Sequence, residues 1–90
     1  MRKPVLVEAQ EAIAGDRQAS YGDARMGFTH VAAQWSLYLF QKHGIDAVLT
    51  PEDVCWMMAD LKKVRQMAGF KRDNVMDAAG YIGLIEQVAP

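Results

Sequence analysis

The sequence predicts an all-α fold: a four-helix, bundle-like single domain spanning residues 1–90. Apolar residues recur at helical spacing in four segments, and glycine or proline separates each segment from the next. No segment alternates apolar and polar residues as a half-buried strand does. The chain has 90 residues, 51% of them hydrophobic, which suits one small core. Because so short a chain buries little of its surface alone, we expect a homo-oligomer to complete the bundle and to bury the last helix.

Two helices are expected in the N-terminal half. Residues 1–15 form a short helix, since Pro4 suits a first helical position and Gly15 a C-terminal stop. Residues 16–23 have turn chemistry and are expected to form a loop. The helical core, residues 24–89, then begins with a long helix that ends at Gly44 and whose apolar face holds Phe28, Val31, Trp35 and Leu39.

The third helix has the clearest start signal in the chain. Residues 50–53, Thr-Pro-Glu-Asp, combine an N-cap threonine, a proline in the first turn and an acidic residue three positions after the cap. This helix is expected to reach about Ala68.

The fourth helix is predicted over residues 74–88, with Asp73 or Asn74 as its cap. It is apolar nearly all round, which is typical of a helix packed against neighbours on several sides. Gly80 and Gly83 weaken a helix interior, so their presence predicts that another element approaches this face closely, together with Met76 and Gln87.

Charged residues are expected where the third and fourth helices meet. Arg65 lies within the apolar stripe of the third helix, and Lys62 lies at its edge. A buried guanidinium needs an anionic partner, because an unpaired buried charge is strongly unfavourable. The short connection makes the helices antiparallel, so that Asp73 and Asp77 face these bases. We therefore expect Arg65 to be buried and paired with Asp77 or Asp73.

Two interpretations of this charged cluster remain open. The first is a structural ion-pair network that fixes the register of the two helices, and the residues alone favour it. The second is a phosphate or nucleotide site, in which the bases bind anionic oxygens and the carboxylates hold a divalent cation.

A family resemblance follows from residues spread over most of the chain. They are Arg17, Tyr21-Gly22-Asp23, Phe28, Trp35, Pro51-Glu52-Asp53-Val54, Met57-Met58, Leu61-Lys62, Arg65, Asp73-Asn74, Asp77 and Gly80-Tyr81. In this order they resemble small phage and prophage proteins of uncharacterised function. The helix with Asp77 and Tyr81 also distantly resembles the metal-binding helix of MazG-like all-α nucleotide pyrophosphohydrolases.

That resemblance implies a site for a nucleoside triphosphate and magnesium. Asp77 would be catalytic and would hold Mg²⁺ together with Asp73. The substrate-binding residues would be Arg17, Tyr21, Lys62, Arg65, Asn74 and Tyr81. The sequence departs from the enzymes at the third helix, where Lys62 and Arg65 replace an acidic pair, and at Asn74, which replaces an acid. The alternatives are therefore a magnesium-dependent hydrolase and a degenerate relative that binds a nucleotide.

Composition limits the other classes of function. The net charge of −1 and the pI of about 6.0 give no overall attraction to nucleic acid, although a basic cluster around Lys62 to Arg72 keeps a small nucleic-acid-binding protein as an alternative. A non-enzymatic protein-interaction module is a further alternative. The single Cys55 and the absence of a secretory or membrane-spanning segment lead us to expect a cytoplasmic protein, in the host cell if it is phage-encoded.

Overall fold

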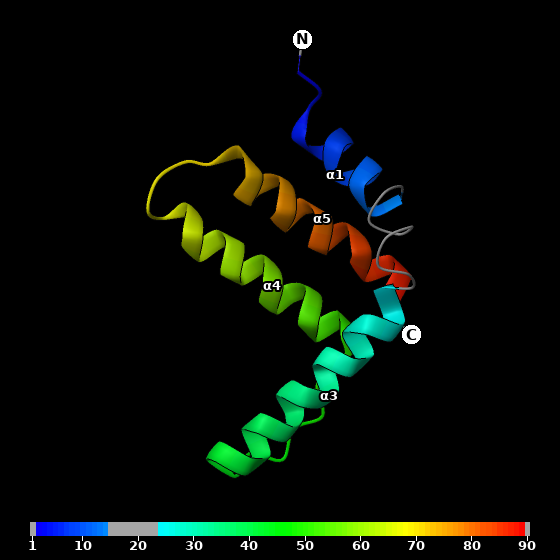
Figure 1. The fold of residues 1–90 in the computed structure, drawn as a ribbon, viewed down its shortest axis with the longest axis vertical. Coiled ribbons are helices and arrows are strands. Elements are labelled where there is room, and N and C mark those ends of the chain that lie inside the picture. The colour runs from blue at the N-terminus through cyan, green and yellow to red at the C-terminus, as the bar shows by residue number, and fades with distance from the viewer. Residues whose placement is uncertain (1, 15–23, 90) are drawn as a thin grey trace.

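The computed structural model describes residues 2–14 and 24–89, and all regular structure within them is helical. Figure 1 shows α4 and α5 side by side and antiparallel, with α1 against the other side of α5 and α3 projecting away from this group. The helices are α1 (Val5–Ala14), α3 (Ala24–His43), α4 (Pro51–Gln66) and α5 (Arg72–Val88). The predicted all-α fold is confirmed, whereas the loop predicted over residues 16–23 lies outside the described residues.

Helix α5 is the centre of the fold, as its all-round apolarity predicts. It packs against each of the other three helices. Leu84 and Val88 are 2% and 3% exposed, and they form the buried cluster together with Cys55 of α4. Ile13 of α1 and Phe28 of α3 pack around this cluster. The core therefore gathers residues from all parts of the chain onto one helix.

The glycine face of α5 receives α1. A methyl group added at Gly83 would lie 3.1 Å from Cδ1 of Ile13, and one added at Gly80 would lie 3.7 Å from Cγ2 of the same side chain. The first distance is tighter than an ordinary carbon contact, so a side chain at position 83 would require Ile13 to shift. The close approach predicted for this face is confirmed at these two glycines, and the approaching element is α1.

The observed end of α3 agrees with the prediction, whereas the observed start of α5 does not. Helix α3 ends before Gly44, which adopts a left-handed conformation (φ 66°) and donates its N–H to the Phe40 carbonyl at 2.9 Å, as predicted. The predicted caps of α5 are wrong. The helix begins at Arg72, its N-cap is Lys71 without a side-chain cap hydrogen bond, and Asp73 lies inside the first turn. A carboxylate in this position interacts favourably with the helix dipole without capping it.

The predicted capping box at the start of α4 is confirmed. The Thr50 hydroxyl accepts a hydrogen bond from the Asp53 N–H at 3.2 Å, and the Thr50 N–H donates to the Asp53 carboxylate at 2.8 Å. Two backbone donors that would otherwise lack partners are satisfied in this way. The start of α4 is therefore determined by local chemistry.

We expect Thr50→Ala to lower the free energy of unfolding by about 1 kcal/mol, because it removes the capping hydroxyl. Urea denaturation followed by circular dichroism measures the difference. Thr29→Ala is the matched control, since the Thr29 hydroxyl only bonds the Arg25 carbonyl within the exposed side of α3. Equal losses in the two variants would contradict the role of the cap.

Two arginines join distant parts of the chain through contacts that the sequence did not predict. Arg72, at the start of α5, pairs with the Glu8 carboxylate of α1 and donates to the Lys3 carbonyl at 2.6 Å. Arg25, at the start of α3, donates to the Gln87 carbonyl at 3.1 Å near the end of α5. These contacts join α1 to the start of α5 and α3 to its end.

Candidate functional site

The charged pair between α4 and α5 is formed by Lys62 and Asp77. The Lys62 Nζ atom lies 3.1 Å from the Asp77 Oδ2 atom, and the two side chains are 14% and 31% exposed. The pair joins the C-terminal part of α4 to the second turn of α5. The predicted proximity of Lys62 and Asp77 is therefore confirmed.

The expectation for Arg65 is wrong. Arg65 is exposed, and within the described residues no ion pair joins it to Asp73 or Asp77. The buried side of α4 runs through Cys55 and Ala59 and continues to the largely covered Lys62. Val54, which the sequence also predicts on the buried face, is 1% exposed, whereas Leu61 and Arg65 are exposed, so the predicted buried face is wrong in the second half of α4.

Lysine suits this position for a physical reason. Its long methylene chain is covered by neighbouring residues while its amino group reaches the carboxylate of Asp77 at the edge of the interface. Arg65, three residues later in α4, lies on the adjacent side of the helix and extends toward solvent. Lys62 therefore takes part in the contact between the helices, whereas Arg65 is exposed.

Asp73 and Asp77 lie one turn apart on α5, and Asp73 is exposed. Within residues 2–14 and 24–89, no group of three or more Asp, Glu, His or Cys side chains is close enough to hold a metal ion. Magnesium takes about six oxygen ligands, so these two carboxylates would need phosphate or water oxygens to complete a site. The carboxylate of Asp77 also has the Lys62 ammonium beside it.

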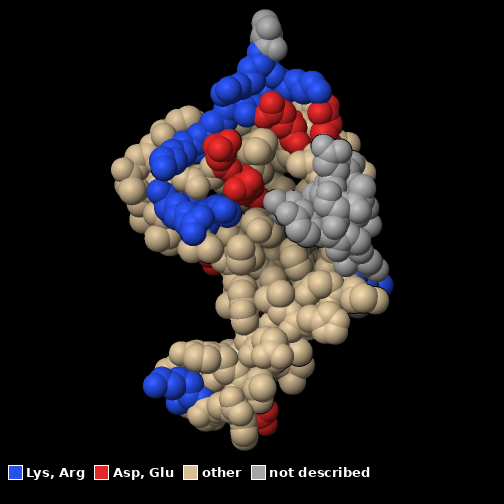
Figure 2. Space-filling view, in the orientation of Figure 1, with Lys and Arg blue, Asp and Glu red and all other residues tan. Residues whose placement is uncertain are grey.

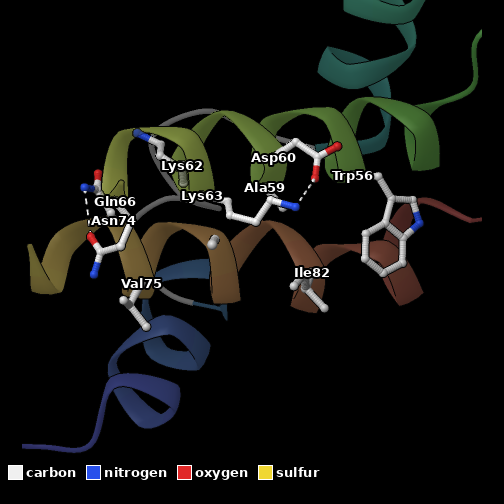
Figure 3. Close-up of a pocket in the computed structure, with 10 residues that line it drawn as sticks. Trp56, Ala59, Asp60, Lys62, Lys63, Gln66, Asn74, Val75 and Ile82 are labelled. Carbon is white, nitrogen blue, oxygen red and sulfur yellow. Dashed lines mark hydrogen bonds and ion pairs between the residues drawn. The ribbon is translucent and has the colours of Figure 1, made fainter. Parts of the chain in front are cut away.

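Asn74 is buried at the start of α5 and is bonded to α4. Its Nδ2 group donates to Oε1 of Gln66 at 3.2 Å, and the same oxygen accepts the Lys71 N–H at 3.0 Å. Figure 3 shows the Asn74 and Gln66 side chains turned toward each other across the two helices. Gln66 thus positions the connection between α4 and α5, a role for which the sequence offered no signal.

A surface pocket of about 500 Å³ lies beside this connection. Arg65 and Lys71, both exposed, place two basic side chains at its lining, and Phe70 adds an exposed aromatic ring. Asn74 also lines it. Two of the predicted substrate-binding residues, Arg65 and Asn74, therefore meet in one pocket next to the Lys62–Asp77 pair.

A second hollow, of about 330 Å³, follows the seam between α4 and α5 (Figure 3). Its walls are mostly apolar and include Trp56, Val75 and Ile82. Three charged residues of α4 also line it: Lys62, which pairs with Asp77, and the highly exposed Asp60 and Lys63, which lie 3.9 Å apart. Lys63 therefore differs from its neighbour Lys62 in having no contact across the helix interface that orders it.

Of the remaining predicted ligand contacts, the structure places only Tyr81. This residue is half-buried, packs against the core cluster, and has its ring 6.2 Å from that of Phe28. Arg17 and Tyr21 lie outside the described residues. Tyr81 lines neither of the two hollows, so the structure does not bring it together with Arg65 and Asn74.

Cys55 has the properties of a structural thiol. It is completely buried, and burial raises its pKa from 9.0 to about 11, with a further contribution from the nearby Glu52 charge. At neutral pH the thiol is therefore protonated and poorly nucleophilic. Cys55 belongs to the core and not to the candidate site.

Comparison with known proteins assigns a family to this chain. The family described as "Domain of unknown function (DUF6378)" matches residues 4–89. The chain belongs to the DUF6378 family. It is 41% identical over 85 residues to the Gene 55 protein of Mycobacterium phage L5, which covers 93% of this chain and 51% of the phage protein. It is also 34% identical over 89 residues to the Gene 55 protein of Mycobacterium phage D29, and this alignment covers 98% of this chain and 55% of the phage protein.

These relatives confirm the predicted resemblance to small phage proteins of unknown function. The chain spans about half the length of the two curated relatives. No solved structure shows a significant match to it. In the described part of the chain, no helix is both long and apolar enough to cross a membrane.

Proposed function

We propose that this DUF6378 protein binds a phosphate-bearing ligand of the nucleotide class on the charged surface of α4 and α5. The observation that most supports the proposal is the Lys62–Asp77 pair, in which a largely covered ammonium group is oriented by a carboxylate on the facing helix. A phosphate oxygen beside Lys62 would meet a cation whose position is already determined, so that little side-chain entropy is lost on binding.

Further basic groups extend this surface. Arg65 and Lys71 are exposed at the neighbouring pocket, where a second phosphate group would meet them. Figure 2 shows basic and acidic side chains gathered over the upper part of the molecule, the region of α1, α4 and α5. Tyr81, one turn after Asp77, would contact the base or sugar of the ligand.

Magnesium and hydrolysis form the finer part of the proposal, and they rest on the MazG-like resemblance. Asp73 and Asp77 would hold Mg²⁺ together with oxygens of the bound phosphate, and the ion would neutralise phosphate charge. Asp77 would then have two roles, as the partner of Lys62 and as a metal ligand. In the same proposal, Arg17 and Tyr21 would also contact the bound nucleotide.

The test is a thermal-stability screen with nucleoside mono-, di- and triphosphates, each with and without magnesium. A ligand at about 100 times its Kd stabilises the folded state by about 2.7 kcal/mol, which raises the Tm measurably for a domain of this size. We expect Lys62→Gln to lose this increase. Lys63→Gln, which removes a neighbouring exposed lysine, is the matched control and should retain it.

Three results would overturn the proposal: no stabilisation by any nucleotide, equal stabilisation by sodium sulfate at the same ionic strength, or equal losses in the two lysine variants. The predicted alternatives have different signatures. Salt-sensitive DNA binding would favour the basic cluster as a nucleic-acid surface. Release of pyrophosphate, lost in Asp77→Asn, would extend the proposal from binding to hydrolysis.

A further inference from the structure

Over its C-terminal half, helix α3 contacts the segment that follows it, where the Leu49 N–H donates to the Ser36 hydroxyl at 2.9 Å, and it lies away from the other helices. Ala32 is its one buried residue in the described chain, and the helix then projects away from α4 and α5 (Figure 1). Leu37, Tyr38 and Phe40 are 48%, 59% and 59% exposed. In the segment after the helix, Val48 is 85% exposed. We call residues 37–48 the α3 tip.

The helix that leads to this tip lacks the charges of an ordinary solvated helix. From Met26 to Gln41 the sequence contains no Asp, Glu, Lys or Arg. Figure 2 shows the consequence, since the surface along α3 has almost no charged side chains until its lower end. A surface helix normally directs charged residues away from the core, so a helix without them on any side is typical of an element covered on several sides.

The chain as a whole exposes more surface than a compact monomer does, and the projecting α3 contributes to this excess. The accessible surface is 6486 Å², whereas a compact monomer of 10.0 kDa has about 5,200 Å². The radius of gyration is 14.4 Å, against about 12 Å for a compact domain of this length. The excess of about 1,200 Å² is comparable to the roughly 800 Å² that each partner buries in a stable interface.

We propose that the α3 tip packs against the same tip of a second copy of this chain, forming a two-fold symmetric dimer. The exposed apolar side chains of the tip are complementary to the same side chains of a second copy, and the two charged residues of the tip, Lys42 and Asp46, have opposite signs. The excess surface of the whole chain is large enough for one partner's share of a standard interface. Packing of α3 against a second copy would also supply the tertiary contact from which most helical stability in proteins comes.

This dimer differs from the one expected from the sequence. There, the partner was expected to bury the last helix, and that contact stays a prediction: α5 packs against α1, α3 and α4 within one chain, while Val75 and Ile82 remain 39% and 47% exposed. The exposed apolar residues of α3 instead place the contact at the other end of the molecule from Lys62 and Asp77. Dimerisation and ligand binding are therefore separable by mutation.

The test is sedimentation velocity of the purified chain from 1 to 100 µM. We expect a dimer, and we expect the double variant Leu37→Glu with Phe40→Glu to be monomeric, with at least 100-fold weaker association. Both side chains are about half exposed in the single chain, so the changes leave the core in place. The double variant Leu6→Glu with Met67→Glu adds the same charge at exposed apolar positions away from the tip and should remain dimeric.

Hydrogen exchange of the unmodified chain gives an independent measurement that does not depend on a variant folding. Amides of residues 37–48 should be protected at 100 µM and should lose protection on dilution to 1 µM, while those of α5 should not change. A wild-type monomer at every concentration would overturn the proposal. So would a dimer that the Leu37 and Phe40 changes leave intact, or exchange at the tip that is independent of concentration.

Discussion

Leu84→Ala is expected to lower the free energy of unfolding by about 3 kcal/mol. Leu84 is 2% exposed and lies on the central helix, in contact with the cluster that includes Cys55 and Val88. Removing a buried leucine side chain loses its transfer free energy and leaves a cavity, and the measured range for such changes is about 2–5 kcal/mol. For a domain of 90 residues this is a large part of the total stability.

Chemical denaturation at one fixed protein concentration measures this loss, because self-association would otherwise change the apparent stability. The matched control is Leu6→Ala. Leu6 is 73% exposed on α1, so the same chemical change should alter the stability by less than about 0.5 kcal/mol. A loss at Leu84 no larger than the loss at Leu6 would contradict the placement of the core on α5.

The second large effect is expected at the Lys62–Asp77 pair. Asp77→Asn leaves the covered ammonium of Lys62 without its carboxylate, and Lys62→Met leaves the carboxylate without its cation. Exposed pairs contribute about 0–1 kcal/mol, and breaking a fully buried pair costs about 3–5 kcal/mol. Because the two side chains are 14% and 31% exposed, we expect about 1–2 kcal/mol for each single change.

A double-mutant cycle measures the pairing directly. The variant with both Lys62→Met and Asp77→Asn should be more stable than the sum of the single losses predicts, by about 1 kcal/mol. The matched cycle combines Arg65→Met with Asp77→Asn, and it should be additive because Arg65 is exposed and does not pair with Asp77. Additivity in the first cycle, or coupling only in the second, would show that Lys62 is not the basic residue that pairs with Asp77.

Stability and nucleotide binding, both measured on the unmodified chain and on Lys62→Gln, separate the two interpretations of the charged cluster. A purely structural pair predicts that Lys62→Gln lowers the stability without any effect of nucleotides on either protein. A ligand site predicts, in addition, that stabilisation by nucleotide is present in the unmodified chain and lost in the variant. The two measurements use the same proteins, so one role can be established without assuming the other.

Much of the fold was predictable because its signals are local. The capping box at Thr50 and the left-handed glycine at position 44 depend on a few neighbouring residues, and both were predicted correctly. The centrality of α5 was also predictable, since a helix without a polar face must be covered. The N-cap at Lys71 was not predicted, because Asp73 and Asn74 are better cap residues, yet the helix begins before them at Arg72.

The candidate site was predictable in its location but not in its pairing. Antiparallel helices joined by a short connection bring their charged ends together, and this followed from the order of residues along the chain. Lys62 and Arg65 are both compatible with that rule. Which of them faces Asp77 depends on the rotation of α4 about its axis.

By itself, the sequence determined the four helices found in residues 2–14 and 24–89, the identity of the central one, and the meeting of basic and acidic residues at one end of α4 and α5. Only the tertiary structure decided which side of α4 is buried and which helix remains uncovered. The reason is that helix formation and capping depend on contacts within a few residues, whereas the rotation of a helix depends on packing between elements far apart in sequence. Here the packing of α4 against α5 places Lys62 beside Asp77, while α3, which packs weakly, extends its apolar tip into solvent.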